Sequence, residues 1–175
     1  LADEIALKTG ATFIHPSNDA NVILGQGTAA LELLNEYSDL NYIFCPVGGG
    51  GLIAGSALAA KYFGNNSKVY GAEPFEADDA YRSLKSGKIE GNETVNTIAD
   101  GLKTTLGDIN FPIIKELVSG IIRVDEDEII AAMKLVWERM KIIIEPSSAV
   151  TVAAVIRQSI ENPEALKNRK VGIII

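Results

Sequence analysis

Four consecutive glycines, in the stretch VGGGGLIAG at residues 47–55, are the strongest candidate for chemistry in this chain. They follow an apolar run of strand length and precede a run of helical character. Glycine allows backbone N–H groups to turn toward a ligand without a Cβ in the way, and a helix N-terminus attracts phosphate. A tight turn alone would need only one or two glycines. The stretch lacks the GxGxxG fingerprint and the Lys-Ser/Thr pair of a Walker loop, so it predicts a different phosphorylated ligand.

Acidic side chains gather in EPFEADDAY at residues 73–81. Glu73 and Asp79 supply two carboxylates and Ala77 a main-chain carbonyl, where a strand is expected to turn into a helix. Oxygen ligands of this kind can converge on a hard cation, with Mg²⁺, Ca²⁺ and Mn²⁺ as candidates. The alternative is that Asp78 and Asp79 cap the helix and that Glu73 is solvated. From the residues alone this alternative is favoured.

Two further polar stretches are weaker candidates. Glu145 in IIIEPSSAV follows an apolar run, and Pro146 suits the first turn of a helix. A buried acid is costly without a partner, so a role is expected there, although an ordinary helix start explains the pattern equally well. Asp100 and Gly101 lie in TIADGL, which is either part of a site or a polar surface loop.

The composition fits a soluble globular protein that binds a small ligand. The chain has 175 residues, 47% of them hydrophobic and 22% charged, which suits one domain with a sizeable core. A net charge of -7 argues against nucleic acid or an anionic membrane surface as a partner. No apolar run approaches the ~20 residues of a membrane helix. Both ends look cut, so a fragment of a longer protein is expected.

Cys45 is the only cysteine and His15 the only histidine. These counts exclude a disulfide framework and a zinc cluster built from cysteine and histidine. A reducing, cytoplasmic setting is therefore expected.

Strand-like and helix-like runs alternate along the chain. Strands are expected at 11–15, 41–47, 67–74, 121–124, 142–144 and 170–175. Helices are expected at 27–37, 52–63, 111–118, 125–140 and 147–160, and a long surface excursion at 85–110. Asp125 and Glu128 have the spacing of a capping box. Because the strands are apolar on both faces, the pattern predicts an α/β fold, with a twisted, mostly parallel sheet and helices on both faces. Ligands of such sheets bind at the carboxyl ends of the strands.

Five motifs resemble, in order and spacing, the pyridoxal-phosphate enzymes of the serine racemase and threonine/serine dehydratase family. They are HPSNDANVILGQGT, PVGGGGLIAG, YGAEP followed by ADDAY, TIADGL, and LVWERMKIIIEPSSAV. The resemblance covers essentially the whole chain and implies the type II fold of these enzymes. Residues 1–18 would then end a small domain, and 19–175 would form a large cofactor-binding domain that is incomplete at both ends. GQGT would lie at the crossing between the two, where a hinge is expected.

The resemblance assigns roles to the residues already singled out. Gly48, Gly49, Gly50, Gly51 and Leu52 match the cup whose main-chain N–H groups hold the phosphate of pyridoxal 5'-phosphate. Sister enzymes such as the cysteine synthases carry a threonine-richer loop there, so the all-glycine form favours the dehydratase and racemase branch. The remaining matches are Glu145 on the cofactor side, Asp100, Gly101 and Thr104 near the substrate, Glu73, Ala77 and Asp79 at the Mg²⁺ or Ca²⁺ site, and Lys141 where serine racemase binds a nucleotide effector.

The same resemblance implies an enzyme that acts on serine or threonine when full length. The expected reactions are β-elimination, which gives a 2-keto acid and ammonia, and serine racemisation, carried out by a homodimer. The lysine that forms a Schiff base with the cofactor precedes this segment in the family, so the fragment alone is expected to be inactive. The alternatives are a non-catalytic regulatory module that binds a phosphorylated ligand, and a β-replacement or threonine synthase-type enzyme.

Overall fold

Four parallel strands form a sheet through the middle of the protein, in the order β3-β2-β1-β4. The computed structural model describes the backbone of residues 1–175 and every side chain except that of Asp3. The strands are β1 (Tyr42–Pro46), β2 (Lys68–Pro74), β3 (Val118–Val124) and β4 (Val171–Ile173). The predicted α/β architecture with a parallel sheet is confirmed.

The parallel pairing brings the two leading candidates of the sequence to one edge of the sheet. β1 and β2 run side by side, from Tyr42 opposite Lys68 to Pro46 opposite Ala72. The glycine run follows the carboxyl end of β1, and the acidic stretch 73–81 begins at the carboxyl end of β2. The fold therefore places both where ligands of parallel sheets bind.

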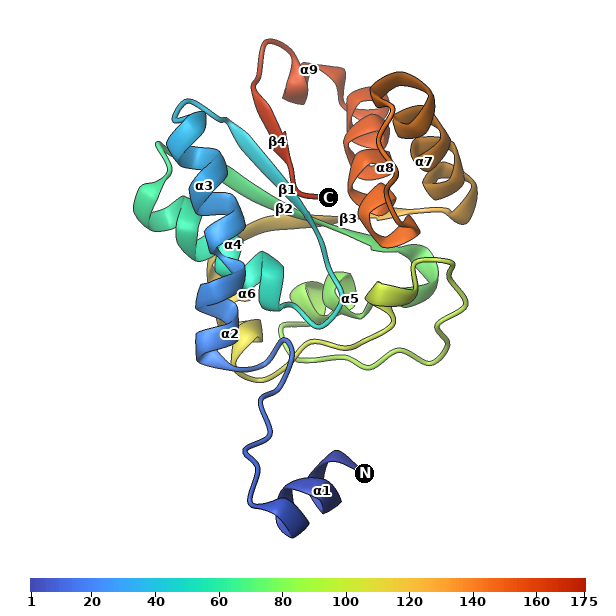
Figure 1. The fold of residues 1–175 in the computed structure, drawn as a ribbon. Helices are drawn as coiled ribbons and strands as arrows, with labels where there is room; N and C mark the ends of the chain where they lie inside the picture. Colours follow the sequence, from blue (N-terminus) through green and yellow to red (C-terminus); the bar gives the residue numbers. More distant parts are fainter.

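Helices cover both faces of the sheet, as Figure 1 shows. On one face lie α2 (Ala20–Gln26), α3 (Thr28–Glu36), α4 (Gly51–Phe63) and α6 (Asn110–Leu117), and on the other lie α7 (Glu126–Met140) and α8 (Pro146–Glu161). The remaining elements are α1 (Ala2–Thr9), α5 (Asp79–Ser86), α9 (Pro163–Leu166) and the 3-10 helices η1 (Phe75–Ala77) and η2 (Asp100–Leu102). In the described chain, none of the helices combines the length and the apolar character that crossing a membrane requires.

Each face of the sheet has its own apolar core. The larger cluster joins Ile43 of β1 to Ile53 of α4 and Ile114 of α6, and the smaller one contains Ile129 of α7 and Val150 of α8. Cys45 of β1 belongs to the larger cluster, and burial raises the pKa of its thiol to about 12. The thiol is thus a core side chain and not a nucleophile.

The capping box that the sequence predicts is present at the start of α7. The backbone N–H of Asp125 donates to Glu128 Oε2 over 2.7 Å. Arg157 of α8 binds both acids, with Nη2 donating to Asp125 Oδ2 over 2.6 Å and Nε donating to Glu128 Oε1 over 2.9 Å. The contact fixes α8 against α7, and α8 begins at the candidate site.

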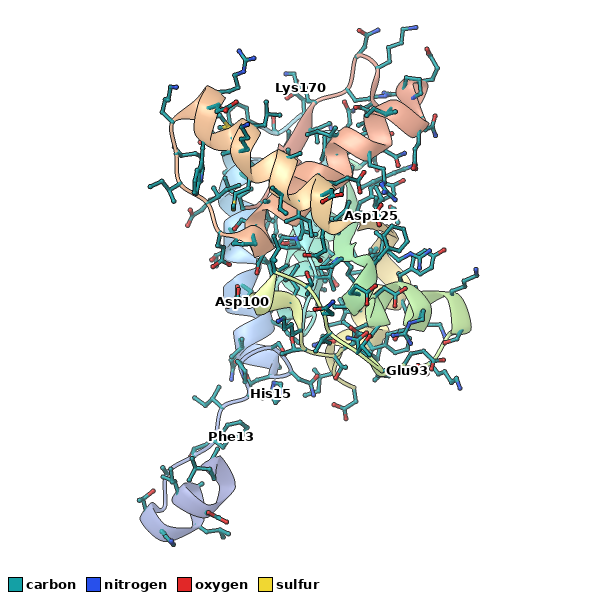
Figure 2. All side chains as sticks on the ribbon, turned by 90° about the vertical axis from the view of Figure 1, so that its right-hand side faces the viewer. Phe13, His15, Glu93, Asp100, Asp125 and Lys170 are labelled. Carbon is teal, nitrogen blue, oxygen red and sulfur yellow. The ribbon has the colours of Figure 1, made fainter. Side chains whose placement is uncertain are left out.

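Two of the predicted strands are wrong. Residues 11–15 have no regular structure, and no strand of the described chain lies beside them to accept their backbone hydrogen bonds. Figure 2 shows Phe13 and His15 in this segment, which joins α1 to the rest of the protein. Residues 142–144 are an irregular link between α7 and α8, in which Ile143 is 88% exposed. Short apolar runs do not by themselves distinguish a strand from a connection.

Two other segments differ in smaller ways from what the sequence predicts. α2 was not predicted, although Asp19 caps it by accepting N–H groups from Asn21 over 2.8 Å and Val22 over 3.2 Å. The excursion at 85–110 contains no strand, but buried residues such as Leu102 and Leu106 show that it also packs on the core.

The first helix stands apart from the rest of the protein. In Figure 1, α1 lies away from the layers of the sheet and its helices, at the end of an extended link. The assignment of residues 1–18 to the end of a small domain and of 19–175 to a large domain stays a prediction.

Candidate functional site

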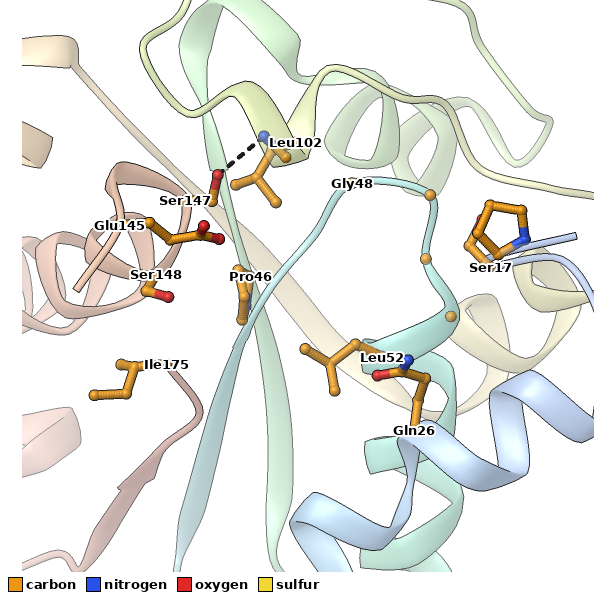
Figure 3. Close-up of a pocket in the computed structure, with 15 residues that line it drawn as sticks. Ser17, Gln26, Pro46, Gly48, Leu52, Leu102, Glu145, Ser147, Ser148 and Ile175 are labelled. Carbon is orange, nitrogen blue, oxygen red and sulfur yellow. Dashed lines mark hydrogen bonds between the residues drawn. The ribbon is translucent and has the colours of Figure 1, made fainter.

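A cavity of about 340 Å³ opens at the carboxyl edge of the sheet, between the glycine loop and the N-terminus of α8. Figure 3 shows the glycine loop on one side and the side chains of Glu145, Ser147 and Ser148 on the other. All five predicted cup residues line it. The lining residues are Pro16, Ser17, Gln26, Pro46, Gly48, Gly49, Gly50, Gly51, Leu52, Gly101, Leu102, Glu145, Ser147, Ser148 and Ile175.

The glycine loop ends in a helix start that is suited to bind an anion. Gly50 is the N-cap of α4 and has φ 85°, in the left-handed region that favours glycine. Within the described chain, no side chain caps this helix, so the first N–H groups of α4 have no side-chain acceptor. Together with the positive end of the helix dipole they have the features of a site that can hold a phosphate.

The loop is packed too tightly for any residue but glycine. A Cβ on Gly49 would lie 2.2 Å from Ser17 Oγ, and a Cβ on Gly51 would lie 2.9 Å from the Ser17 carbonyl oxygen. A Cβ on Gly48 would lie 2.9 Å from the carbonyl oxygen of Gly101. Each of the four positions thus favours glycine, Gly50 through its left-handed backbone and the other three because a Cβ would be too close to neighbouring atoms. A simple strand-to-helix turn would not require this at all four positions.

The opposite wall is built by the N-terminus of α8. Ser147 is buried, and its Oγ accepts the backbone N–H of Gly101 over 3.1 Å, shown dashed in Figure 3. Glu145 is the N-cap residue of α8 and is exposed, with Pro146 at the first helical position. The expectation of a buried acid at Glu145 is therefore wrong, because the residue follows an open link and not a buried strand. Its contact with a cofactor stays a prediction.

The residues predicted near the substrate lie around the cavity to different degrees. Gly101 lines it, and Thr104 Oγ1 lies 3.1 Å from the position of a Cβ on Gly48. Asp100, at the start of η2, is exposed and does not line the cavity. Lys141 is exposed at the C-terminus of α7 with φ 62°, and it does not line the cavity either. The roles of these residues stay predictions.

Glu73 and Asp79 form a pair of fully buried carboxylates. The two oxygens of Glu73 accept the N–H groups of Ala80 over 3.1 Å and Tyr81 over 2.9 Å. Asp79 accepts from Asn92 Nδ2 over 2.8 Å and from the N–H of Leu106 over 3.0 Å. The donors are all uncharged amides. The alternative in which Glu73 is solvated is therefore wrong.

The charges of this pair are poorly compensated. Burial raises the pKa of Glu73 well above its usual range, and the nearby Asp79 raises it further. Burial also raises the pKa of Asp79. The adjacent Asp78 does not cap α5 but forms ion pairs with Arg82 over 2.7 Å and Arg123 over 2.8 Å. These arginines are thus engaged by Asp78.

A metal centre made of side chains alone is not found in the described part of the chain, where no group of three or more His, Cys, Asp or Glu could hold an ion. The predicted set is of another type, since it has two carboxylates and the carbonyl of Ala77. Ala77 ends η1, between the two acids, and is buried. The chain thus places these three buried residues in one short segment, from the end of β2 to the start of α5.

Three residues of the site were not identified from the sequence. Ser17 packs against the glycine loop, and Ser147 accepts a hydrogen bond from Gly101 in η2. Asn110 donates to the backbone carbonyls of both Ser17 and Gly49. Ser147 could have been found from its place beside Glu145. Asn110 carries no such signal, because an asparagine in a polar stretch is typical of a turn.

Comparisons with known proteins point to one family of enzymes. A family model described as "Pyridoxal-phosphate dependent enzyme" matches residues 1–175. Serine racemase from Dictyostelium discoideum is 57% identical over 164 residues, which are 93% of this chain and 50% of that protein. The chain thus spans about half the length of the curated relatives it matches.

Solved structures of similar enzymes also superpose closely on this chain. Maize serine racemase superposes with a TM-score of 0.93 at 42% identity, over 98% of this chain and 53% of that one. The T.th. threonine deaminase superposes with a TM-score of 0.89 at 40% identity, over 98% of this chain and 58% of that one. The predicted type II fold is confirmed, and the chain belongs to the family of pyridoxal-phosphate-dependent enzymes.

Proposed function

We propose that the protein containing this chain is a pyridoxal-phosphate enzyme that acts on a small hydroxy amino acid. Its reactions would be serine racemisation, dehydration of serine or threonine, or both. The observation that carries the proposal is the all-glycine loop at the uncapped start of α4, facing a cavity whose far wall is the start of α8. The resemblance to serine racemases and a threonine deaminase supports this choice of reactions.

The residues of the cavity fit the cofactor. Its phosphate would be held by the N–H groups of Gly49 to Leu52, in a loop whose close packing against neighbouring residues leaves no room for Cβ atoms. When bound, the cofactor supplies an electron sink for the α-carbon of an amino acid. The residues of this chain would bind and orient it, and Ser147 keeps Gly101 and the rest of η2 beside the cavity. Glu145 lies on the wall opposite the cup, where its carboxylate can meet the ring side of the ligand.

The experiment that tests the proposal uses the full-length protein. Mixed with pyridoxal phosphate, it should show a visible absorption band that borohydride abolishes. Incubated with L-serine and L-threonine, it should release 2-keto acid, D-amino acid or both, and their ratio separates dehydration from racemisation. A protein without the visible band would be the regulatory module instead, and a band without either product would indicate a β-replacement or threonine synthase-type enzyme.

We also propose that Glu73, the carbonyl of Ala77 and Asp79 bind Mg²⁺ or Ca²⁺ in the whole protein. The two carboxylates are fully buried and receive only amide N–H groups, and among the described residues neither forms an ion pair, since Arg82 and Arg123 pair with Asp78. Burying such charges is unfavourable unless a cation accompanies them. Carboxylate and carbonyl oxygens are the ligands that these cations prefer.

Removing divalent cations is expected to lower the melting temperature of the full-length protein. Treatment with EDTA should lower it by about 5 °C, and Mg²⁺ or Ca²⁺ should restore it, since an ion that binds only the folded state stabilises it by mass action. The variant Glu73→Gln should lose this response, whereas Glu76→Gln, an exposed acid in the same turn, should keep it. A wild-type protein that melts at the same temperature with EDTA and with either cation would contradict the proposal.

Three expectations about the whole protein stay proposals. They are the homodimer, the cytoplasmic setting and a nucleotide effector at Lys141.

A further inference from the structure

Asn110 connects three separate segments behind the glycine loop. It is the first residue of α6, it is fully buried, and it does not line the cavity. Its Oδ1 accepts the N–H of Gly107 over 3.1 Å. Its Nδ2 donates to the carbonyl oxygen of Gly49 over 2.6 Å and to that of Ser17 over 3.1 Å. The amide group is therefore fully used, and both of its donated bonds go to backbone around the cup.

The bond to Gly49 decides which way the next N–H group points. In a trans peptide the C=O of one residue and the N–H of the following residue point in opposite directions. Because the Gly49 carbonyl is held toward α6, the N–H of Gly50 is directed to the other side of the loop. Gly50 lines the cavity and Asn110 does not, so the side away from the Asn110 amide is the side of the cavity.

We propose that Asn110 is a positioning residue that presets the phosphate cup by fixing the peptide between Gly49 and Gly50. The inference rests on the proposed function, since it concerns the cofactor phosphate. Glycine on both sides of this peptide leaves its rotation without the usual steric barriers. An external clamp is therefore needed to keep the N–H groups oriented before the cofactor arrives, and Asn110 is the side chain that provides it. The bond to Ser17 fixes the neighbouring segment, against which Gly49 and Gly51 pack.

The test compares two ligands that differ only in the phosphate. Apoprotein of the full-length Asn110→Leu variant is titrated with pyridoxal phosphate and with pyridoxal. Leucine has nearly the same size and no charge, so the change removes the hydrogen bonds without repelling phosphate. We expect affinity for pyridoxal phosphate to fall about tenfold to hundredfold, as for a lost buried hydrogen bond that leaves its carbonyl unpaired. Affinity for pyridoxal should stay within about twofold, because pyridoxal does not use the cup.

Asn41→Leu is the matched control. Asn41 also accepts a backbone N–H, that of Lys170 over 2.9 Å, but it lies before the amino end of β1. It should leave both affinities unchanged. If Asn110→Leu lowers both affinities equally, or neither, Asn110 has only a structural role and the inference is wrong. If the wild type itself binds the two ligands equally, the proposed function fails, whatever the variant does.

A second variant and a second measurement cover poor folding of the first. Asn110→Ala is titrated in the same way, since its smaller side chain leaves space for water. Should neither variant fold, crystal structures of the wild-type protein without and with cofactor decide whether Asn110 holds the Gly49–Gly50 peptide in place. The bond between Asn110 Nδ2 and the Gly49 carbonyl in both forms supports the inference, and a Gly49–Gly50 peptide that turns over on cofactor binding overturns it.

Discussion

Replacing Gly50 with alanine should reduce the affinity of the full-length protein for pyridoxal phosphate by about a hundredfold or more. Gly50 has φ 85°, where an L-residue is destabilised by about 1–2 kcal/mol. The new Cβ would also lie 2.6 Å from Leu106 Cδ2 and 2.8 Å from Asn110 Oδ1. Either the loop or the buried side chains of Leu106 and Asn110 must shift to relieve these contacts, and a total of about 3 kcal/mol corresponds to roughly a hundredfold in affinity. Titration of the apoprotein, followed by absorbance, measures the effect.

Gly91→Ala is the control for this substitution. Gly91 lies in the polar excursion, its φ is not positive, and a Cβ there would have nothing within 4 Å. Its affinity for the cofactor should match that of the wild type. A Gly50→Ala protein that binds the cofactor as tightly as the wild type would show that the N–H groups of this loop do not hold the phosphate.

The main elements of the sheet could be predicted because their environment is uniform along each strand. Residues of β1 and β2 are covered by helices on both faces, so most positions are apolar and the run stands out. The runs at 11–15 and 142–144 are similarly apolar but have no neighbouring strand. Pairing depends on the tertiary arrangement, which an apolar run of three to five residues does not encode.

The cup could be predicted because glycine acts through its own backbone. The function of Gly50 needs only its conformation and its place before α4, and both are visible in the sequence. Asn110 could not be found in this way, since its role arises only where the chain brings Ser17 and Gly49 to its amide group. Glu73 could be predicted as a candidate ligand, but its burial could not. Its burial depends on the N–H groups of the turn that follows it, and the composition of that turn suggested solvent exposure.

Gly55→Ala is expected to cause the largest loss of stability. A Cβ at this position of α4 would lie 2.2 Å from the carbonyl oxygen of Ile23 and 2.5 Å from the nitrogen of Gly27. Both are backbone atoms at the junction of α2 and α3, so no side chain can move aside. Overpacking of this kind costs about 3 kcal/mol, which exceeds the ~1 kcal/mol that alanine gains over glycine in a helix. The melting temperature of the full-length protein should fall by about 5 °C or more.

Gly25→Ala on α2 makes the comparison decisive, because its expected effect has the opposite sign. Gly25 is also a helical glycine, but a Cβ there has nothing within 4 Å. Its replacement should therefore raise the melting temperature slightly, through helix propensity alone. α4 begins at the cup, so Gly55→Ala should also weaken cofactor binding by displacing that helix, whereas Gly25→Ala should not. If both variants are stabilised alike, the close packing of α4 against the α2–α3 junction is not what holds the cup in place.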